Sequence, residues 1–209
     1  MIKITLPDGS VKEFASGVTP HEVALSISEG LARNVISASF NGTTIETATP
    51  LTTDGSLVLY TWNDAEGKKA FWHSTSHVMA QALEEKFPGI KLTIGPAIEN
   101  GFYYDVDFGD KRITDADFKD IEDRVLAIAK EKHEFKMRSA SKAEALELYK
   151  DNEYKTELIT NLEDGTISFC DHSTFTDLCR GGHIPNTGII KAMKILSVAG
   201  AYWRGDEKN

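Results

Sequence analysis

One polar break divides this chain into two segments of unequal length. Residues 63–69, with the sequence NDAEGKK, contain no apolar period, whereas apolar residues recur on both sides of them. Domain boundaries fall in exposed, polar stretches of this kind, where few contacts cross. The sequence therefore predicts two domains, residues 1–62 and residues 63–209.

The first 62 residues combine strand and helix patterns. In IKITLPDGSVKEF, apolar residues alternate on both sides of a turn signal, which predicts a β-hairpin at residues 2–14. Thr19 can cap a helix that has Pro20 at its first position. Asn-Gly and Asp-Gly turns then separate further strand segments within residues 35–61. A hairpin, a crossing helix and more strands predict a small α+β unit of the ubiquitin-like, β-grasp type.

The second segment also mixes helices and strands, which predicts a larger α+β domain. Apolar residues at helical spacing predict a helix at residues 70–87, and alternation predicts short strands within residues 91–108. Two capping-box patterns, which begin at Thr114 and Ser141, predict two more helices. Strand-like segments are also expected at residues 155–160 and 166–170.

Composition and charge limit the cellular setting. The sequence has no run of roughly 18 apolar residues, and its start lacks the basic-then-apolar pattern of a secretory signal. We therefore expect a cytoplasmic protein without a membrane partner, whose two cysteines are thiols or metal ligands rather than a disulfide. The net charge of -9 argues against nonspecific nucleic-acid binding, so any nucleic-acid contact must be local.

Four residues of metal-ligand type stand in two closely spaced pairs. His73 and His77 are four apart in the predicted helix, so both imidazoles project from one face. Cys179 and His183 are also four apart, in the stretch DLCRGGH, where two adjacent glycines favour a shaped loop over a helix. Such a loop could fold over the helix and combine the two pairs, with Asp177 beside them.

Residue types alone leave two chemical interpretations of these pairs open. HxxxH plus CxxxH supplies the nitrogen and sulfur ligands that zinc prefers. Without metal, the same imidazoles and a nearby acid could orient and deprotonate water or a hydroxyl. A zinc peptidase is disfavoured because Ser74 replaces the glutamate that its motif requires. A thiol protease is disfavoured because no oxyanion site is visible.

Several longer motifs resemble a known family. They are HSTSHVMAQAL (residues 73–83), IGPAIENGFYYD (residues 94–105), FTDLCRGGH (residues 175–183) and AGAYWRGD (residues 199–206). With them the chain resembles the N-terminal region of bacterial threonyl-tRNA synthetase, which is a TGS-type β-grasp domain followed by an editing domain of the threonyl/alanyl-tRNA synthetase type. The first domain matches mainly through PDGS, FNG and TDGSL, and the loop reads CRGGH where Gly-Pro is expected in many relatives.

The resemblance implies hydrolysis of the ester in tRNA(Thr) mischarged with serine. Serine lacks one methyl group of threonine, a difference worth only about 1–3 kcal/mol in binding, so a second, hydrolytic site must remove the errors. The resemblance implies four catalytic residues. One of two imidazoles orients the attacking water or engages the terminal ribose hydroxyl, a lysine counters the charge on the ester oxygen, and an acid orients the base or receives the serine amine. The four residues are His73, Lys155, Asp177 and His183, with His77, Tyr104 and Cys179 as substrate-binding residues.

The resemblance to the threonyl enzyme favours a site without metal or other cofactor. Zinc held by the two pairs, as in the alanyl-type relatives, is the alternative. Cys170 and His172 lie near enough in the sequence to serve as substitute ligands, but a surface or core role is expected for them instead. We also expect the full synthetase core to be absent, so that the chain cannot itself charge tRNA. Two other functions remain open: a non-catalytic binding module with a structural zinc site, and an unrelated metal-dependent hydrolase of small esters.

Overall fold

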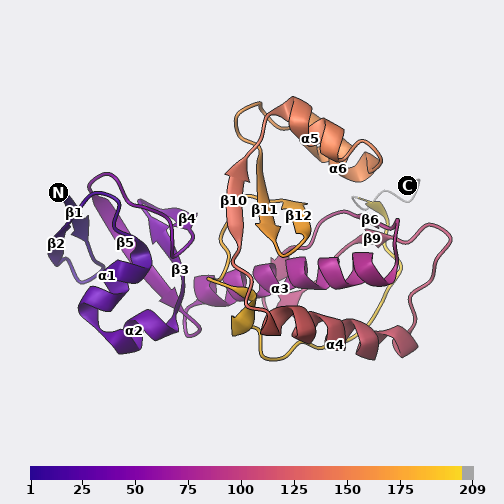
Figure 1. The fold of residues 1–209 in the computed structure, drawn as a ribbon, viewed down its shortest axis with the longest axis horizontal. Coiled ribbons are helices and arrows are strands. Elements are labelled where there is room, and N and C mark those ends of the chain that lie inside the picture. The colour runs from indigo at the N-terminus through magenta and orange to yellow at the C-terminus, as the bar shows by residue number, and fades with distance from the viewer. Residues whose placement is uncertain (204–209) are drawn as a thin grey trace.

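The structure is a computed structural model that describes residues 1–203. Residues 204–206, the end of the AGAYWRGD motif, lie outside the described part. The structure combines helices with strands, often in runs of one kind, which confirms the α+β fold class, and two bodies lie side by side (Figure 1). Within residues 1–203, no helix has the length and apolar character needed to cross a bilayer. The predicted division at residue 62 stays a prediction, and "first domain" and "second domain" denote its two sides.

The first domain is built on a five-stranded sheet with the strand order β2-β1-β5-β3-β4. The strands are β1 (Ile2–Thr5), β2 (Val11–Phe14), β3 (Val35–Phe40), β4 (Thr43–Ile45) and β5 (Gly55–Thr61). β1 and β2 pair antiparallel, which confirms the hairpin, and β1 pairs parallel with β5. Asn41 and Gly42, both with positive φ, form the turn between β3 and β4.

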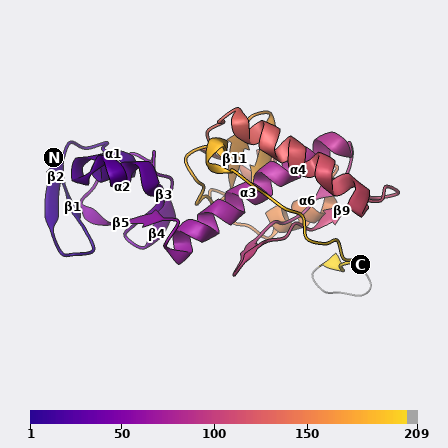
Figure 2. The same cartoon turned by 90° about the horizontal axis from the view of Figure 1, so that it is seen from below.

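Two short helices cover one face of this sheet (Figure 2). The predicted helix is confirmed as α1 (Pro20–Ile27), and Thr19 forms a complete capping box with Glu22. A second helix, α2 (Glu29–Asn34), was not expected. Ser28 ends α1 through its backbone N–H and caps α2 through its hydroxyl. A single residue thus separates two helices, which is too short a break to recognise from apolar spacing.

The first helix of the second domain, α3 (Ala65–Lys86), begins five residues earlier than predicted. It includes AEGKK from the polar stretch, so this stretch is not an extended linker. Asp64 accepts hydrogen bonds from the Thr61 backbone N–H (2.7 Å) and hydroxyl (2.9 Å). Gly67 lies against the Thr61 carbonyl so closely that an added Cβ would be 1.9 Å from the oxygen. A tight corner therefore joins β5 to α3.

The second domain packs around α3. The other helices are α4 (Asp115–Lys130), α5 (Lys142–Leu148), α6 (Glu153–Thr160) and the 3-10 turn η1 (Thr187–Ile189). The longer strands, β10 (Lys136–Ser139), β11 (Ser168–His172) and β12 (Phe175–Leu178), form one antiparallel sheet. The short strands β6 (Lys91–Leu92) and β9 (Val106–Asp107), and β7 (Ala97–Ile98) and β8 (Gly101–Phe102), form two pairs.

Two local predictions for this domain were wrong. Residues 155–160, expected as a strand, lie in α6, which is capped by Asn152. The capping box expected at Ser141 is incomplete, because Ser141 accepts from the Glu144 backbone but the Glu144 carboxylate binds Arg138 instead. The box at Thr114 is complete and starts α4.

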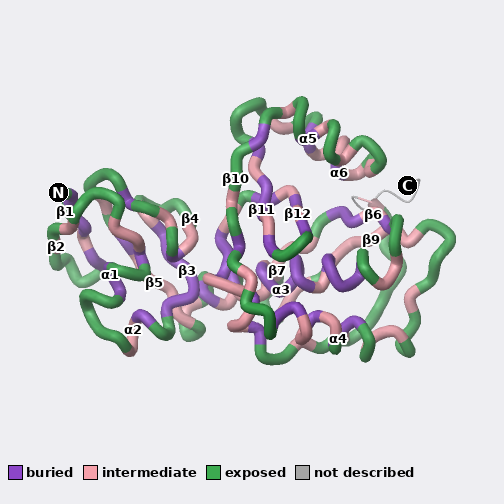
Figure 3. The backbone as a smooth tube through the Cα atoms, viewed as in Figure 1, coloured by how far each residue is buried: buried purple, intermediate pink, exposed green. Residues whose placement is uncertain are grey.

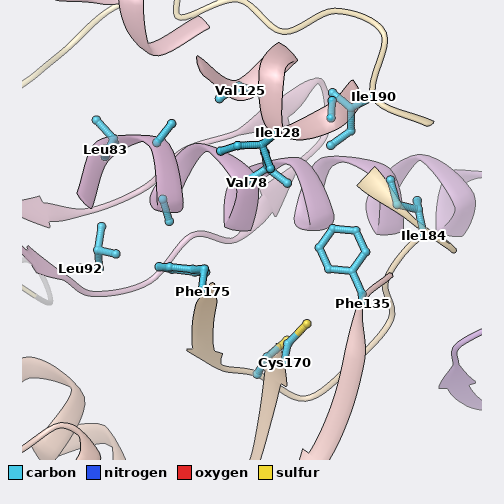
Figure 4. Close-up of a cluster of buried hydrophobic side chains, with 14 of the residues drawn as sticks. Val78, Leu83, Leu92, Val125, Ile128, Phe135, Cys170, Phe175, Ile184 and Ile190 are labelled. Carbon is cyan, nitrogen blue, oxygen red and sulfur yellow. The ribbon is translucent and has the colours of Figure 1, made fainter. Parts of the chain in front are cut away.

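The buried residues of the second domain concentrate along α3 (Figure 3). Val78 of α3 lies between Ile128 of α4 on one side and Phe135 on the other (Figure 4). Ile36 of β3 belongs to the same apolar cluster. At the junction, Trp62 makes edge-on contacts with the Phe71 and Trp72 rings of α3. The two domains therefore share apolar contacts beside α3.

Candidate active site

Helix α3 presents the first pair of ligand-type residues. Because His73 and His77 are one helical turn apart, their rings meet edge to face with centroids 4.6 Å apart, and their Nε2 atoms are 3.4 Å apart. His77 is buried, whereas His73 is half-buried. The HxxxH spacing thus produces the shared face that the sequence predicted.

The second pair lies where β12 ends. β12 carries Asp177, and Cys179 continues the pairing through a backbone bond to the Ser168 carbonyl (3.0 Å). Gly181 and Gly182 then take φ angles of +95° and +88°, which favour glycine and turn the chain back toward α3. The predicted shaped loop is confirmed, and its end brings His183 against the helix.

The two pairs form one cluster, in which the four ligand atoms all lie within 4.8 Å of one another. The Cys179 Sγ is 3.1 Å from the His73 Nε2 and 3.2 Å from the His183 Nε2. Ligand atoms around a tetrahedral zinc ion are about 3.3–3.6 Å apart, given its bond lengths. The donor set of three imidazoles and one thiolate therefore fits zinc in its chemistry. Three of its separations, 3.1, 3.2 and 3.4 Å, are close to the zinc spacing, whereas the set as a whole extends to 4.8 Å. We call these four residues the His/Cys cluster.

Asp177 connects the His/Cys cluster to the remaining predicted site residues. Its carboxylate accepts hydrogen bonds from the His77 Nδ1 (2.9 Å) and the Tyr104 hydroxyl (2.8 Å). The Lys155 ammonium, from α6, pairs with its other oxygen. Both side chains of that ion pair are almost fully buried, at 2% and 4% exposure. All seven predicted site residues therefore meet in one place.

These contacts determine the charges around Asp177. Burial alone would raise the pKa of Asp177, but the Lys155 ammonium and the His77 hydrogen bond hold it well below its usual range. Burial opposes the charge of His77, but bonds to Asp177 and Cys179 outweigh it and raise the pKa of His77 to about 10. Burial and the Asp177 charge raise the pKa of Tyr104, which stays a hydrogen-bond donor near neutral pH. Asp177 is thus an ionised carboxylate that accepts from three donors.

The other cluster members differ in protonation. Burial would raise the pKa of the Cys179 thiol, but the three surrounding imidazoles hold it well below its ordinary value. Burial lowers the pKa of His73, which favours a neutral imidazole. Burial also opposes the charge of His183, but bonds to Cys179 and Glu46 outweigh it and raise its pKa. The half-buried His73 is therefore the imidazole of this cluster best suited to accept a proton.

Sequence reasoning missed two neighbours of His183. Glu46, from the first domain, lies with its Oε1 3.1 Å from the His183 Nδ1. Phe135 stacks on the His183 ring with centroids 5.2 Å apart. No motif marks either residue. Cys170 and His172 are both buried, which decides between the surface and core roles left open for them, and neither belongs to the His/Cys cluster.

A cavity of about 1050 Å³ adjoins the site. Tyr104 lines it together with Phe102, Tyr103 and Trp72, while the Tyr104 hydroxyl binds Asp177. In the described part of the chain, the lining does not include the His/Cys cluster itself. Tyr104 thus lies at the border between an aromatic cavity and the charged groups.

Comparisons with known proteins agree with this architecture. Residues 2–61 match the TGS domain, and residues 167–209 match the threonyl and alanyl tRNA synthetase second additional domain. The whole chain is 83% identical over 209 residues to a threonine–tRNA ligase from Flavobacterium johnsoniae and 54% identical over 211 residues to one from Cytophaga hutchinsonii. It spans 32% of the length of the first of these two relatives and 33% of the second. From end to end, the chain thus matches the N-terminal region of threonyl-tRNA synthetases, a TGS domain followed by the second additional domain.

Proposed function

We propose that this chain is a proofreading hydrolase that cleaves the ester of serine attached in error to threonine tRNA. One observation carries the proposal: the seven side chains expected for such a site converge around Asp177 and the His/Cys cluster. The match to threonyl-tRNA synthetases supports tRNA as the partner and the cytoplasm as the place of the reaction.

In this proposal, His73 is the general base. Its imidazole is neutral near pH 7 and, alone in the His/Cys cluster, half-buried rather than buried. It takes a proton from water as the water oxygen attacks the ester carbonyl carbon. The bond to the ribose oxygen then breaks, and the imidazolium returns the proton to that oxygen. Acid–base catalysis of this kind contributes about 10²–10⁴-fold to the rate.

Lys155 and Asp177 supply the electrostatic part of the mechanism. The carbonyl oxygen becomes negative as water adds, and a buried ammonium stabilises it strongly because little water screens the charge. Asp177 already accepts from Lys155, His77 and Tyr104. These bonds favour a role in orienting His77 and Lys155 over a role in binding the serine amine.

Selectivity follows from the size of the substrate pocket. His77, Cys179 and Tyr104 are the proposed walls, which admit serine and exclude the extra methyl group of threonine. One methyl group changes the free energy of binding in such a pocket by about 1–3 kcal/mol. The terminal adenosine of the tRNA stacks on the aromatic rings that line the adjoining cavity, among them Phe102 and Tyr103.

The fit of the His/Cys cluster to zinc keeps a metal-dependent variant open. His73, His77, Cys179 and His183 would hold the ion. Bound zinc would act as a Lewis acid and lower the pKa of a bound water. The roles of Lys155 and Asp177 are the same in both variants, because neither belongs to the cluster.

The test is the rate at which the purified chain deacylates seryl-tRNA(Thr) and threonyl-tRNA(Thr), with and without a zinc chelator. We expect loss of the seryl ester alone, unaffected by the chelator. His73→Ala and Lys155→Ala should each lower the rate about 10²-fold or more. His21→Ala and Lys119→Ala, which change exposed residues of the same types, are the matched controls. Equal rates for the His73 and Lys155 variants and the parent would refute the assignment.

The His/Cys cluster also supports a second candidate, a non-catalytic binding module stabilised by structural zinc. A structural zinc site contributes folding free energy, so a chelator would unfold the protein. In that case circular dichroism would change on chelation, and no ester would be hydrolysed at saturating substrate. An editing enzyme without metal would keep both its fold and its activity.

A further inference from the structure

A carboxylate of the first domain reaches the loop that ends in His183. Glu46 directly follows β4, which lies on the side of the first domain nearest the second (Figure 1). Its Oε1 accepts a hydrogen bond from the Gly182 backbone N–H (2.9 Å) and lies 3.1 Å from the His183 Nδ1. Glu46 is 136 residues from Gly182 in the sequence and 137 residues from His183.

The loop is shaped to admit this carboxylate. An added Cβ on Gly181 would lie 3.2 Å from the Glu46 Oε1, and one on Gly182 would lie 3.2 Å from the Thr44 methyl carbon. Both glycines also have positive φ. Side chains at these two positions would press on residues 44–46 and strain the loop. The close contact between the domains thus explains both glycines.

The bond from His183 fixes which ring nitrogen faces the cluster. A carboxylate accepts but does not donate, so the Nδ1 of His183 must carry the proton in this contact. The Nε2 is then directed at the Cys179 Sγ, 3.2 Å away. His77 has the same arrangement, with Asp177 at its Nδ1 and the cluster at its Nε2. Carboxylates that bind the far nitrogen of an imidazole orient the ring in this way at many functional sites.

We propose that Glu46 is a positioning residue of the hydrolytic site: it holds the loop at Gly182 and keeps His183 with its Nδ1 as donor and its Nε2 facing Cys179. The first domain therefore contributes a side chain to the site in the second domain. This inference rests on the proposed hydrolysis, but its contacts can also be measured without it. Loss of such an orienting partner typically costs about 10–100-fold in activity.

The experiment compares Glu46→Leu, which removes the acceptor, with Glu46→Gln, which keeps a neutral one. We expect Glu46→Leu to lower kcat for seryl-tRNA(Thr) deacylation about 10–100-fold with a smaller change in KM. Glu46→Gln should recover most of kcat. Glu22→Leu is the matched control, because Glu22 also accepts from a backbone N–H (2.8 Å) and a side chain, but at the start of α1. It should keep the parent kcat.

A second readout follows the ring of His183 directly. Long-range ¹H–¹⁵N spectra at one pH identify the protonated ring nitrogen, and the signals that disappear in His183→Asn assign the residue. Glu46→Leu should shift the His183 Nδ1 signal while circular dichroism stays that of the parent. An active parent whose kcat is unchanged in Glu46→Leu would overturn the inference. If the parent is inactive, the proposed function fails, and an unshifted His183 signal would then reject the role of Glu46 as well.

Discussion

The buried pair of Lys155 and Asp177 allows a quantitative test of the site's electrostatics. Lys155→Met keeps the length of the side chain but removes its charge, which leaves Asp177 with His77 as its described cationic partner. Unit charges about 4 Å apart interact by about 4 kcal/mol at an effective dielectric constant near 20. Removing one partner of a buried pair costs about 3–5 kcal/mol. We expect the free energy of unfolding to fall by about 3 kcal/mol, the lower end, because His77 remains.

The interaction itself is isolated by a double-mutant cycle with Asp177→Asn. We expect a coupling free energy of at least about 2 kcal/mol, because the double variant leaves neither charge unpaired. Urea unfolding supplies the free energies, provided that far-ultraviolet circular dichroism and tryptophan fluorescence give coincident transitions. The exposed pair Lys119 and Asp123 is the control, and its coupling should be within experimental error. Additivity of the two buried substitutions within about 0.5 kcal/mol would refute the reasoning.

Three further substitutions test other parts of the structure. Within residues 1–203, neither ring nitrogen of the buried His172 has a hydrogen-bond partner, and burial lowers the pKa of His172 to about 3, against 6.5 in the unfolded chain. Between about pH 3 and pH 6.5 the unfolded chain therefore binds a proton at His172 that the folded chain does not. Stability is unaffected above pH 6.5 and falls below it, by about 2–3 kcal/mol at pH 4.5. His172→Phe should remove this part of the acid sensitivity, which urea unfolding at pH 7 and pH 4.5 measures. Gly67→Ala should lower Tm, because the clash with the Thr61 carbonyl costs about 1–3 kcal/mol and exceeds the gain in helix propensity of about 1 kcal/mol. Gly30→Ala should instead raise Tm, because its Cβ would make only an ordinary contact of 3.9 Å with the Ser28 hydroxyl oxygen. Tyr104→Phe should lower the free energy of unfolding by about 1.5–3 kcal/mol, the range for a hydrogen bond to a charged group, and an unchanged value would mean that this bond is absent in solution.

Local patterns were sufficient to predict the four residues of the His/Cys cluster. His73 and His77 followed from helical spacing, and Cys179 and His183 from a glycine-containing motif, because each pair lies within one turn or one loop. Long-range contacts behave differently. Asp177 contacts Lys155, 22 residues away in the sequence, and Tyr104, 73 residues away. At such sequence separations, residue spacing does not predict a contact. The place of Lys155 and Tyr104 in the site could be expected only from the resemblance to a family, whereas Asp177 stands two residues before Cys179 in the sequence motif.

The wrong predictions have physical reasons. Residues 155–160 were predicted as a strand, yet the buried Lys155 and Ile159 are four apart and define a helical face. The Asn152 cap was the local signal that could have indicated this helix. Glu46 had no signal, because a single acid after a strand is common on protein surfaces. Its partner is an imidazole 137 residues away.

The corner between β5 and α3 limits how this protein can be dissected. A recombinant fragment that begins at residue 63 would lose Thr61, the partner of Asp64, and Trp62, whose ring contacts Phe71 and Trp72. It would thereby expose two large aromatic side chains to solvent and to other copies of the fragment, which promotes aggregation. Poor solubility of such a fragment would reflect the position of the cut rather than an unstable domain. Expression should therefore include the whole first domain, so that the corner, the strands that pair with β5 and Glu46 are all retained.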